Sequence, residues 1–337
     1  MQKIKKILKF VLKVFLVLFS LACVFLIFFN IPVQKENADA KLGVTFSKRY
    51  AEDIGLNWRE AYIATLDDLK ARKIRVPIYW DWVSLKEGEY DFVDLDWQLE
   101  EAQKRQAEII LVVGQKVPRW PECFIPEYLK ADDVRRKEEL LKFVGVVVER
   151  YKNNPAVKYW QVENEPFLKF GECPELDVDL LDQEIALVRK IDPTRKVIIT
   201  DSGELSLWTR AEKRADIFGT TMYRTIYSHK YGFYTYPIGP RFFQFKYWMN
   251  RLLIGQKNAI VIELQAEPWI AGWTTNQPLE KQFESMNVEG LKENVSFARK
   301  VGFPEIYLWG VEWWYWLKTT QNHPEVWETA KIMFSNQ

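Results

Sequence analysis

The chain opens with a long apolar stretch and then changes to short apolar runs that alternate with longer amphipathic segments. Residues 10–33 are apolar apart from Lys13, Ser20 and Asn30, and the nine residues before them include four lysines. Such a stretch is long enough to cross the roughly 30 Å hydrocarbon layer of a membrane. It exceeds the usual signal-peptide core of about 7–15 residues, which favours a retained signal anchor over a cleaved leader.

The charges around this stretch predict its orientation. Lysines at 3, 5, 6 and 9 precede it, so the amino terminus is expected in the cytoplasm and the rest of the chain outside. The expected organisation is a basic flank and transmembrane anchor at 1–33, a polar linker at 34–40 and one domain at 41–337. "ADA" at 38–40 fits a small-residue cleavage site, and cleavage after Ala40 would instead give a secreted protein.

Beyond the linker, eight short apolar runs have the composition of β-strands. Near-continuous apolar strands are typical of a parallel sheet that is covered on both faces. The runs are residues 42–46, 73–80, 107–114, 156–162, 196–200, 215–223, 259–264 and 305–310.

Helical patterns separate these runs, most clearly at 57–73, 93–106, 134–152 and 325–335. Eight strand–helix units fit an α/β fold of the (β/α)₈ TIM-barrel type, which typically takes about 250 residues plus insertions. A doubly wound open sheet is the alternative, but no glycine-rich phosphate loop follows the first strand. The pattern therefore predicts a single barrel preceded by an N-terminal transmembrane helix.

The composition argues against two classes of function and favours a third. The 337 residues carry a net charge of +1, which argues against a nucleic-acid partner because such partners usually require a basic patch. With two histidines and three cysteines, the chain is poorly supplied with ligands for a hydrolytic metal site. Fifteen tryptophans suit a protein that stacks flat ligands. We expect no metal, no cofactor and a monomeric protein.

Polar residues follow two of the predicted strands. The fourth run ends in Glu163, Asn164, Glu165 and Pro166, and the seventh ends at Glu263. In a barrel of this kind the carboxyl ends of all strands meet at the active-site mouth. Two carboxyls that face each other across a pocket are the requirement of glycoside hydrolysis, in which one protonates the leaving oxygen and the other attacks the anomeric carbon. Spacing alone also allows two unrelated acids on a solvated rim.

The surrounding residues resemble the clan of retaining (β/α)₈-barrel glycoside hydrolases that includes family 5 cellulases and mannanases and family 42 β-galactosidases. The motif that carries the resemblance is Asn164-Glu165-Pro166 at the end of the fourth strand. The resemblance implies that Glu165 is the acid/base, that Asn164 binds the sugar 2-hydroxyl and that Glu263 is the nucleophile.

Other positions match the same clan over essentially all of residues 41–337. By this resemblance Arg75 on the second strand pairs with the nucleophile, Tyr223 on the sixth donates to it, and Trp309 on the eighth forms the floor of the sugar site. Many family 5 members carry histidines near the ends of the third and sixth strands, and neither histidine of this chain clearly fits. The exact family therefore stays open at this point.

Two alternatives concern the identity of the pocket residues. Glu267 is a rival nucleophile, but Glu263 is preferred because four further residues take the chain past the strand, and Pro268 cannot donate to a ladder. At the end of the third strand, Gln115 or Lys116 is expected to face the pocket in place of a histidine.

Two further acids have open roles. By strand alternation Glu163 should face the same way as Glu165, where it would either raise the pKa of Glu165 or form a salt bridge with a lysine. Glu204, after the fifth strand, is expected to cap a helix rather than bind substrate hydroxyls.

Tryptophans are frequent near the predicted mouth. About half of them are expected in the core, and the others as platforms that pack on the axial hydrogens of a pyranose, with Trp80 and Trp269 assigned to substrate binding. The set is Trp80, Trp82, Trp120, Trp269, Trp273, Trp313 and Trp314.

The predicted function is that of a membrane-anchored retaining glycoside hydrolase, with its catalytic domain outside the cytoplasm and a β-linked oligo- or polysaccharide as substrate. Double displacement through a covalent glycosyl-enzyme is the expected mechanism. The alternatives are a catalytically inactive glycan-binding barrel and a transglycosylase that uses the same two glutamates. The shortage of histidines and acid clusters argues against a metal-dependent isomerase or lyase.

Two cysteines are placed to form a disulfide. Cys123 and Cys173 follow the third and fourth strands, whose loops emerge side by side in a parallel barrel. An oxidising exterior permits a bridge, which would stabilise the fold by about 2–4 kcal/mol. Cys23 lies in the expected membrane span and should take no part.

Overall fold

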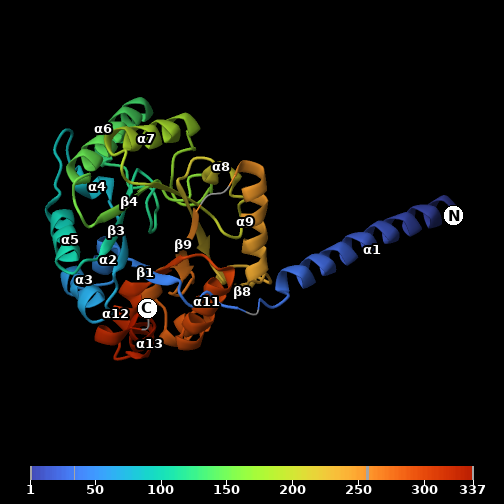
Figure 1. Ribbon diagram of the computed structural model, residues 1–337. Helices are drawn as coiled ribbons and strands as arrows, with labels where there is room; N and C mark the ends of the chain where they lie inside the picture. The colour runs from blue at the N-terminus through green and yellow to red at the C-terminus, as the bar shows by residue number, and fades with distance from the viewer. Residues whose placement is uncertain (1, 34, 256–257, 336–337) are drawn as a thin grey trace.

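The structure is a computed structural model that describes residues 2–33, 35–255 and 258–335. Most of the chain forms a closed barrel surrounded by helices, and a single long helix, α1 (Gln2–Asn30), projects from the side of the barrel (Figure 1). Among the described residues, the segment Lys5–Asn30 of this helix is long and apolar enough to cross a membrane: its most apolar 18-residue stretch has a mean hydropathy of 2.8 and none of that stretch is buried.

Eight parallel strands close the barrel in the order β1-β10-β9-β6-β5-β4-β3-β2, which confirms the predicted TIM barrel. Ring closure pairs the first strand with the last, from Lys41 opposite Glu305 to Thr45 opposite Trp309. The strands are β1 (Lys41–Thr45), β2 (Lys73–Pro77), β3 (Glu108–Val113), β4 (Val157–Val162), β5 (Val197–Asp201), β6 (Ile217–Met222), β9 (Asn258–Gln265) and β10 (Glu305–Trp309).

Amphipathic helices cover the outside of the barrel, and several begin at a side-chain cap. Asn57, Asp132 and Asp177 accept backbone N–H bonds at the first turns of α3, α6 and α7, which satisfies donors that have no partner within the helix. The helices are α2 (Lys48–Asp53), α3 (Trp58–Asp67), α4 (Trp80–Val83), α5 (Val93–Lys104), α6 (Asp133–Tyr151), α7 (Val178–Ile191), α8 (Thr209–Glu212), α9 (Pro240–Ile254), α10 (Leu279–Ser285), α11 (Val288–Val301), α12 (Val311–Thr320) and α13 (Glu325–Ser335).

The barrel interior is filled by branched and aromatic side chains. Ile110, Ile198, Ile260 and Ile262 pack there with Tyr307. Gly43 makes room for that tyrosine, since a Cβ at position 43 would lie 2.7 Å from its ring. The barrel interior is thus a packed core, and in barrels of this type the functional residues lie at the carboxyl ends of the strands.

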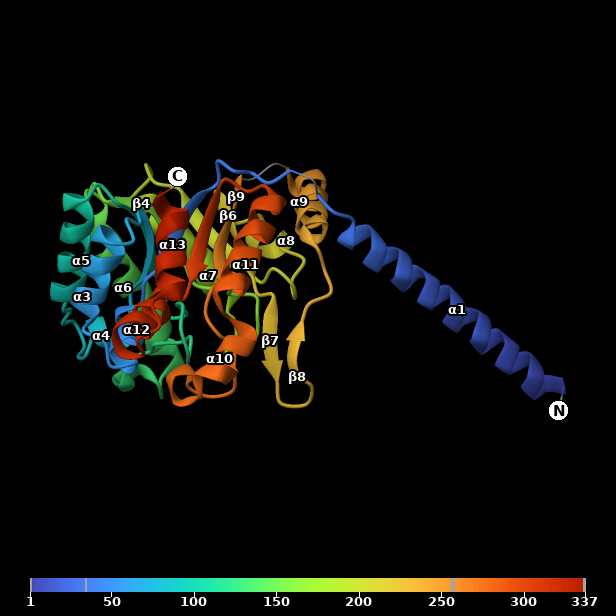
Figure 2. The same ribbon diagram turned by 90° about the horizontal axis from the view of Figure 1, so that it is seen from below.

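The segment between β6 and β9 holds elements that the sequence pattern did not predict. An antiparallel hairpin, β7 (Thr225–Ser228) and β8 (Gly232–Thr235), is followed by α9. Figure 2 shows the hairpin extending past the carboxyl ends of the strands, on the same side of the barrel as α1. The predicted helix at 57–73 is shorter than expected, because Lys70 adopts a left-handed conformation and the chain turns into β2.

Hydrogen bonds fasten the polar linker to the amino end of the barrel. The backbone N–H of Asn37 donates to the carbonyl of Arg299 at 2.9 Å, and that of Lys41 donates to Pro304 at 2.9 Å. Ser296 donates to the Glu36 carboxylate at 2.6 Å. The linker therefore lies against α11 and the turn after it.

Candidate active site

A buried arginine joins three groups at the carboxyl end of the barrel. Arg75, on β2, donates from Nη1 to Glu263 Oε1 at 2.5 Å, from Nη2 to Asn164 Oδ1 at 2.7 Å and from Nε to Gln161 Oε1 at 2.8 Å. Three of the five N–H donors of the Arg75 guanidinium therefore bind residues that lie on, or directly after, two other strands. This network fixes the relative positions of the acid on β9 and the amide after β4.

Glu263 has a hydrogen-bond donor on each oxygen. Besides the bond from Arg75, its Oε2 accepts from the hydroxyl of Tyr223 at 2.9 Å. Both bonds are charge-assisted, which makes them short and strongly orienting. The carboxylate is 3% exposed, so it is held in one direction with little contact with water.

Glu165 has a different environment. Its carboxyl accepts one bond, from the Thr221 hydroxyl at 3.0 Å, and its backbone N–H donates to Thr200 at 2.8 Å. Burial raises the pKa of Glu165 well above its ordinary value, and the negative charges of Glu263 and Glu122 raise it further. At neutral pH this group therefore keeps its proton far better than an exposed glutamate.

A third carboxyl, which no sequence motif indicated, completes the site. Glu122 accepts a hydrogen bond from Asn164 Nδ2 at 3.2 Å, and burial together with the charge of Glu263 raises the pKa of Glu122 to about 8. It lies in the loop after β3, next to the disulfide between Cys123 and Cys173, which confirms the predicted bridge. That pairing was the one signal in the sequence that could have placed Glu122 beside the fourth strand.

Neither role predicted for Glu163 is correct. Glu163 and Glu165 have φ values of 55° and 42°, so the extended-strand alternation does not apply to them. The Glu163 carboxylate turns away from the site and accepts the backbone N–H groups of Gln115 at 2.9 Å and Lys116 at 2.7 Å. It also hydrogen-bonds Glu184 of α7, whose pKa is raised well above its ordinary value by burial and then by the charge of Glu163.

The two residues expected in place of a histidine point elsewhere. Lys116 is buried and donates to the carbonyls of Glu165 at 3.1 Å and Leu168 at 2.8 Å, which supports the loop that carries the acid. Gln115 accepts from Arg136 of α6, outside the barrel. Lys116 thus acts on the site through the backbone, and Gln115 takes no part in it.

Glu204 does not cap a helix, contrary to the prediction. Its carboxylate accepts the backbone N–H of Tyr223 at 3.0 Å, and burial raises the pKa of Glu204 to about 8. The short helix that follows, α8, has Trp208 at its cap position without a side-chain cap bond. Glu204 therefore supports the residue that donates to Glu263.

Glu267, the rival nucleophile, belongs to a neighbouring cluster. Arg119 binds it with both terminal nitrogens and also donates to Glu312 at 2.8 Å. Trp309 donates to Glu267 from its indole nitrogen at 2.8 Å, and the Arg119 guanidinium lies 4.0 Å from the centre of the Trp309 ring. Burial raises the pKa of Glu312 to about 7. In this cluster the Glu267 carboxylate accepts hydrogen bonds from three nitrogens of two side chains, Arg119 and Trp309.

The tryptophans divide into core and mouth residues. Trp313 and Trp314 are fully buried. Trp80 is 1% exposed and stacks on Phe143 of α6 at 5.4 Å, so this packing contradicts its predicted role as a sugar platform. Trp269 is partly exposed and contacts the ring of Tyr223 at 5.0 Å, which places it at the mouth. Trp120 and Trp273 are also exposed there, at 55% and 45%.

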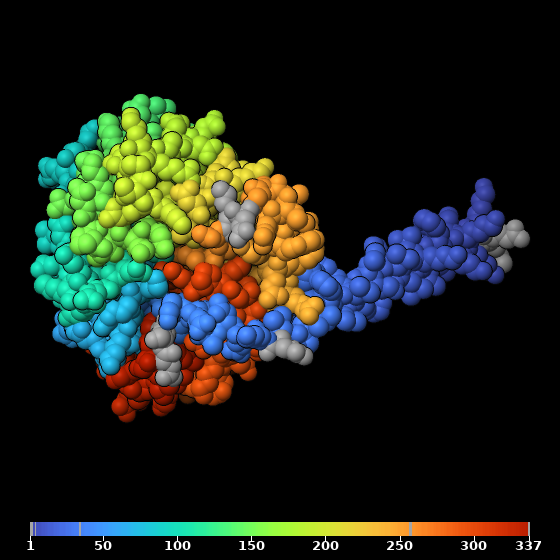
Figure 3. Space-filling model, in the orientation of Figure 1, coloured from blue at the N-terminus to red at the C-terminus, as the bar shows by residue number. Residues whose placement is uncertain are grey.

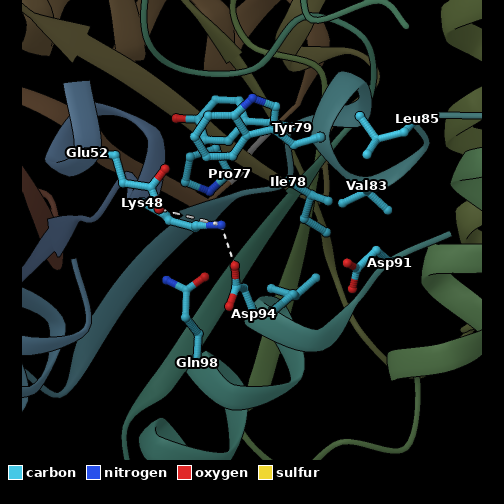
Figure 4. A pocket seen from close by; sticks show the side chains of 12 residues that line it. Lys48, Glu52, Pro77, Ile78, Tyr79, Val83, Leu85, Asp91, Asp94 and Gln98 are labelled. Carbon is cyan, nitrogen blue, oxygen red and sulfur yellow. Dashed lines mark hydrogen bonds and ion pairs between the residues drawn. The ribbon is translucent and has the colours of Figure 1, made fainter. Parts of the chain in front are cut away.

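A separate hollow of about 340 Å³ lies between α2, α4 and α5 (Figure 4). Lys48 points into it and binds Asp94. The ring of Trp82 lies at its edge, but Lys48 and Arg49 lie 4.8 Å and 4.7 Å from the ring centre. Because these cations compete for the ring faces, we do not assign this hollow to sugar stacking. Within the described residues no cluster of histidine, cysteine and acid side chains is arranged to hold a metal ion.

The fold and the site together define the class of (β/α)₈-barrel glycoside hydrolases, in which carboxylates from different strands converge at the carboxyl mouth. The cellulase (glycosyl hydrolase family 5) sequence model matches residues 41–288. The chain therefore belongs to glycosyl hydrolase family 5, which settles the family that the sequence motifs left open.

Individual relatives are distant. Over 180 residues the chain is 26% identical to endoglucanase H of Acetivibrio thermocellus, and the match covers 50% of this chain but only 18% of that enzyme. The β-galactosidase of the haloarchaeon Halorubrum lacusprofundi aligns with a TM-score of 0.59 at 15% identity, over 88% of this chain and 57% of its own. Xylanase 10B of Thermotoga petrophila aligns with a TM-score of 0.57 at 13% identity, over 88% and 94%. These two structures share the barrel fold.

Proposed function

We propose that the protein is a retaining glycoside hydrolase that cleaves a β-linked oligo- or polysaccharide. The observation that carries the proposal is the contrast between two buried carboxyls. Glu263 is oriented by Arg75 and Tyr223, whereas Glu165 has a raised pKa and a single side-chain donor. One group is thus prepared to attack and the other to give a proton.

The proposed reaction has two displacements. Glu263 attacks the anomeric carbon while Glu165 passes its proton to the glycosidic oxygen, so the bond to the leaving sugar breaks and a glycosyl-enzyme ester forms. Glu165, now ionised, takes a proton from water, which attacks the same carbon and releases Glu263. Asn164, held between Arg75 and Glu122, is proposed to bind the 2-hydroxyl, and Trp269 and Trp309 to border the sugar.

Trapping the covalent intermediate tests the nucleophile. Dinitrophenyl 2-deoxy-2-fluoroglycosides of several β-linked sugars should inactivate the protein and add one fluoroglycosyl group at Glu263, located by mass spectrometry of a proteolytic digest. Glu263→Gln should abolish labelling, and Glu267→Gln is the matched control. A label on Glu267, or an inverted first product by NMR, contradicts the assignment.

The acid/base is tested with substrates of graded leaving groups. Glu165→Ala should slow substrates whose leaving oxygen needs a proton by about 10²–10⁴-fold and spare activated aryl glycosides. Azide should then accelerate turnover by attacking the glycosyl-enzyme and yield a β-glycosyl azide. Equal losses on all leaving groups without azide rescue would exclude Glu165 from this role.

We further propose that α1 is retained as a membrane anchor, with residues 34–40 as the linker and 41–337 as the catalytic domain outside the cytoplasm. The support is the apolar span with its basic flank. The full chain should resist extraction with alkaline carbonate, and the catalytic domain should be digested by protease added from outside the cell. A mature protein that begins at Lys41 would instead show a cleaved, released enzyme.

A further inference from the structure

The outer face of α9 carries large apolar side chains that no part of the described chain covers fully. Residues 245, 248 and 252 recur at helical spacing and therefore share one face of the helix. An apolar patch of this kind on the surface of a folded domain usually marks a contact with a protein or a membrane. The residues and their exposed fractions are Phe245 at 38%, Trp248 at 52%, Leu252 at 64% and Leu253 at 66%. We call this set the α9 patch.

The base of the transmembrane helix packs directly against this patch. Phe29 contacts the rings of Phe242 and Phe245, each at 5.5 Å, and Phe28 contacts Phe245 at 6.3 Å. Asn30 donates from its side chain to the carbonyl of Pro237 at 2.9 Å, just before α9. Figure 3 shows the end of α1 meeting the barrel at the surface of α9. The α9 patch thus continues the apolar surface of the helix that would span the bilayer.

A hollow of about 810 Å³ lies at the junction of the two helices. Its lining is apolar on the α1 side, with Ile31 and Val33, and includes Arg241 and Trp248 on the α9 side. The Nε atom of Arg241 is buried and has no hydrogen-bond partner within the described residues. An apolar hollow next to an arginine has the chemistry to receive a lipid, with its chain against the apolar side and its phosphate near the guanidinium.

The orientation of the elements fits a flat surface. α9 runs across the direction in which α1 leaves the barrel (Figure 1), so a bilayer crossed by α1 would lie along the length of α9. The β7–β8 hairpin extends on the same side of the barrel (Figure 2). Its turn contains Lys230 and Tyr231, and Tyr231 is 72% exposed. Tyrosine, tryptophan and lysine are residues that settle at the membrane–water interface.

We propose that the barrel rests on the bilayer through the α9 patch, with the tip of the β7–β8 hairpin as a second contact. The occupant of the α9 patch is the phospholipid surface itself, because the patch is continuous with α1 and cannot be far from lipid once α1 is inserted. The proposal rests on the membrane anchoring proposed above. It adds that the catalytic domain is oriented on the membrane rather than free to tumble on a tether.

The test measures where single sites of the full chain sit relative to lipid. In a Cys23→Ser background, which removes the one free thiol of the described chain, a nitroxide is attached to Leu252→Cys or, as a second site, Leu253→Cys. The protein is reconstituted in vesicles of phosphatidylcholine and phosphatidylglycerol. Collision rates with oxygen, which concentrates in lipid, and with a nickel chelate, which stays in water, are read by electron paramagnetic resonance. Val134→Cys on α6 is the matched control, because Val134 is 70% exposed.

Labels at 252 and 253 should show an oxygen-to-nickel ratio severalfold above that of the label at 134. A ratio equal to the control at both sites overturns the proposal. A label at Phe15→Cys in α1 distinguishes failure of docking from failure of the anchor. A high oxygen-to-nickel ratio at 15 with a low ratio at 252 refutes docking alone. A low ratio at 15 refutes the anchor as well. Spin–spin broadening at 252 that disappears on dilution into excess lipid would identify a second copy as the occupant and also overturn the proposal.

Discussion

Removal of the Cys123–Cys173 bridge should destabilise the barrel by a calculable amount. The two cysteines are 50 residues apart in sequence, with their Cα atoms 5.2 Å apart. Cross-linking a loop of this length lowers the entropy of the unfolded chain by about 14 cal/mol/K, which corresponds to about 4 kcal/mol at 25 °C. For a domain of nearly 300 residues, an entropy of unfolding of about 0.6 kcal/mol/K converts this into a fall in Tm of roughly 6 °C.

The assay compares thermal unfolding of the full chain in detergent by circular dichroism. The Cys123→Ser/Cys173→Ser variant and the wild type treated with a phosphine reductant should both show the lower Tm. Cys23→Ser, which leaves the bridge intact, is the control and should keep the wild-type Tm. A shift below about 1 °C in both the reduced protein and the double variant would refute the reasoning, because it would mean that the unfolded chain gains no freedom when the bridge is absent.

Three further predictions concern individual side chains. Tyr223→Phe should lower kcat/KM by about 10–100-fold, because a hydrogen bond to a charged group contributes about 1.5–3 kcal/mol; unchanged rates on an aryl glycoside would contradict its role at Glu263. Glu122→Gln removes a charge that raises the pKa of Glu165, so the alkaline limb of the kcat/KM profile should move to lower pH, and a shift to higher pH would be contrary to this account. Glu184 has a folded-state pKa above its ordinary value of 4.5, so the folded state loses stability as pH rises through the folded-state pKa. Glu184→Gln should remove this loss. The urea midpoint of the variant should therefore exceed that of the wild type by an amount that grows with pH.

The barrel could be predicted from the sequence because buried parallel strands are nearly all apolar, and all eight predicted runs overlap a strand of the structure. The hairpin β7–β8 was missed, although its run of β-branched and aromatic residues around Gly232 carries strand and turn signals. The hairpin lies outside the barrel and is not one of the eight strand–helix units from which the fold was predicted.

The site was predictable where regular structure positions the side chain. Arg75, Tyr223 and Glu263 lie on or directly after barrel strands and converge as the resemblance implied. The prediction for Glu163 failed because both Glu163 and Glu165 have left-handed backbones, so the side-chain alternation of an extended strand does not apply to them. The predicted disulfide places Glu122 near the fourth strand, but the direction of its side chain depends on the path of the loop after β3, which no sequence pattern indicates.

If α1 is retained in a membrane as proposed, the linker hydrogen bonds also determine how far from the lipid surface the enzyme can act. A flexible linker of seven residues would add roughly 15 Å to the average distance between anchor and domain. In this protein Glu36, Asn37 and Lys41 are fastened to the barrel, and Asn30 is bonded beside α9, so little of that length is available. With α1 inserted, the enzyme could bind glycans only up to about one domain diameter from the lipid surface, near 50 Å for a domain of this size. Glycans further from the lipid surface would have to come to the enzyme, and the cell could select its substrates by their height above the bilayer.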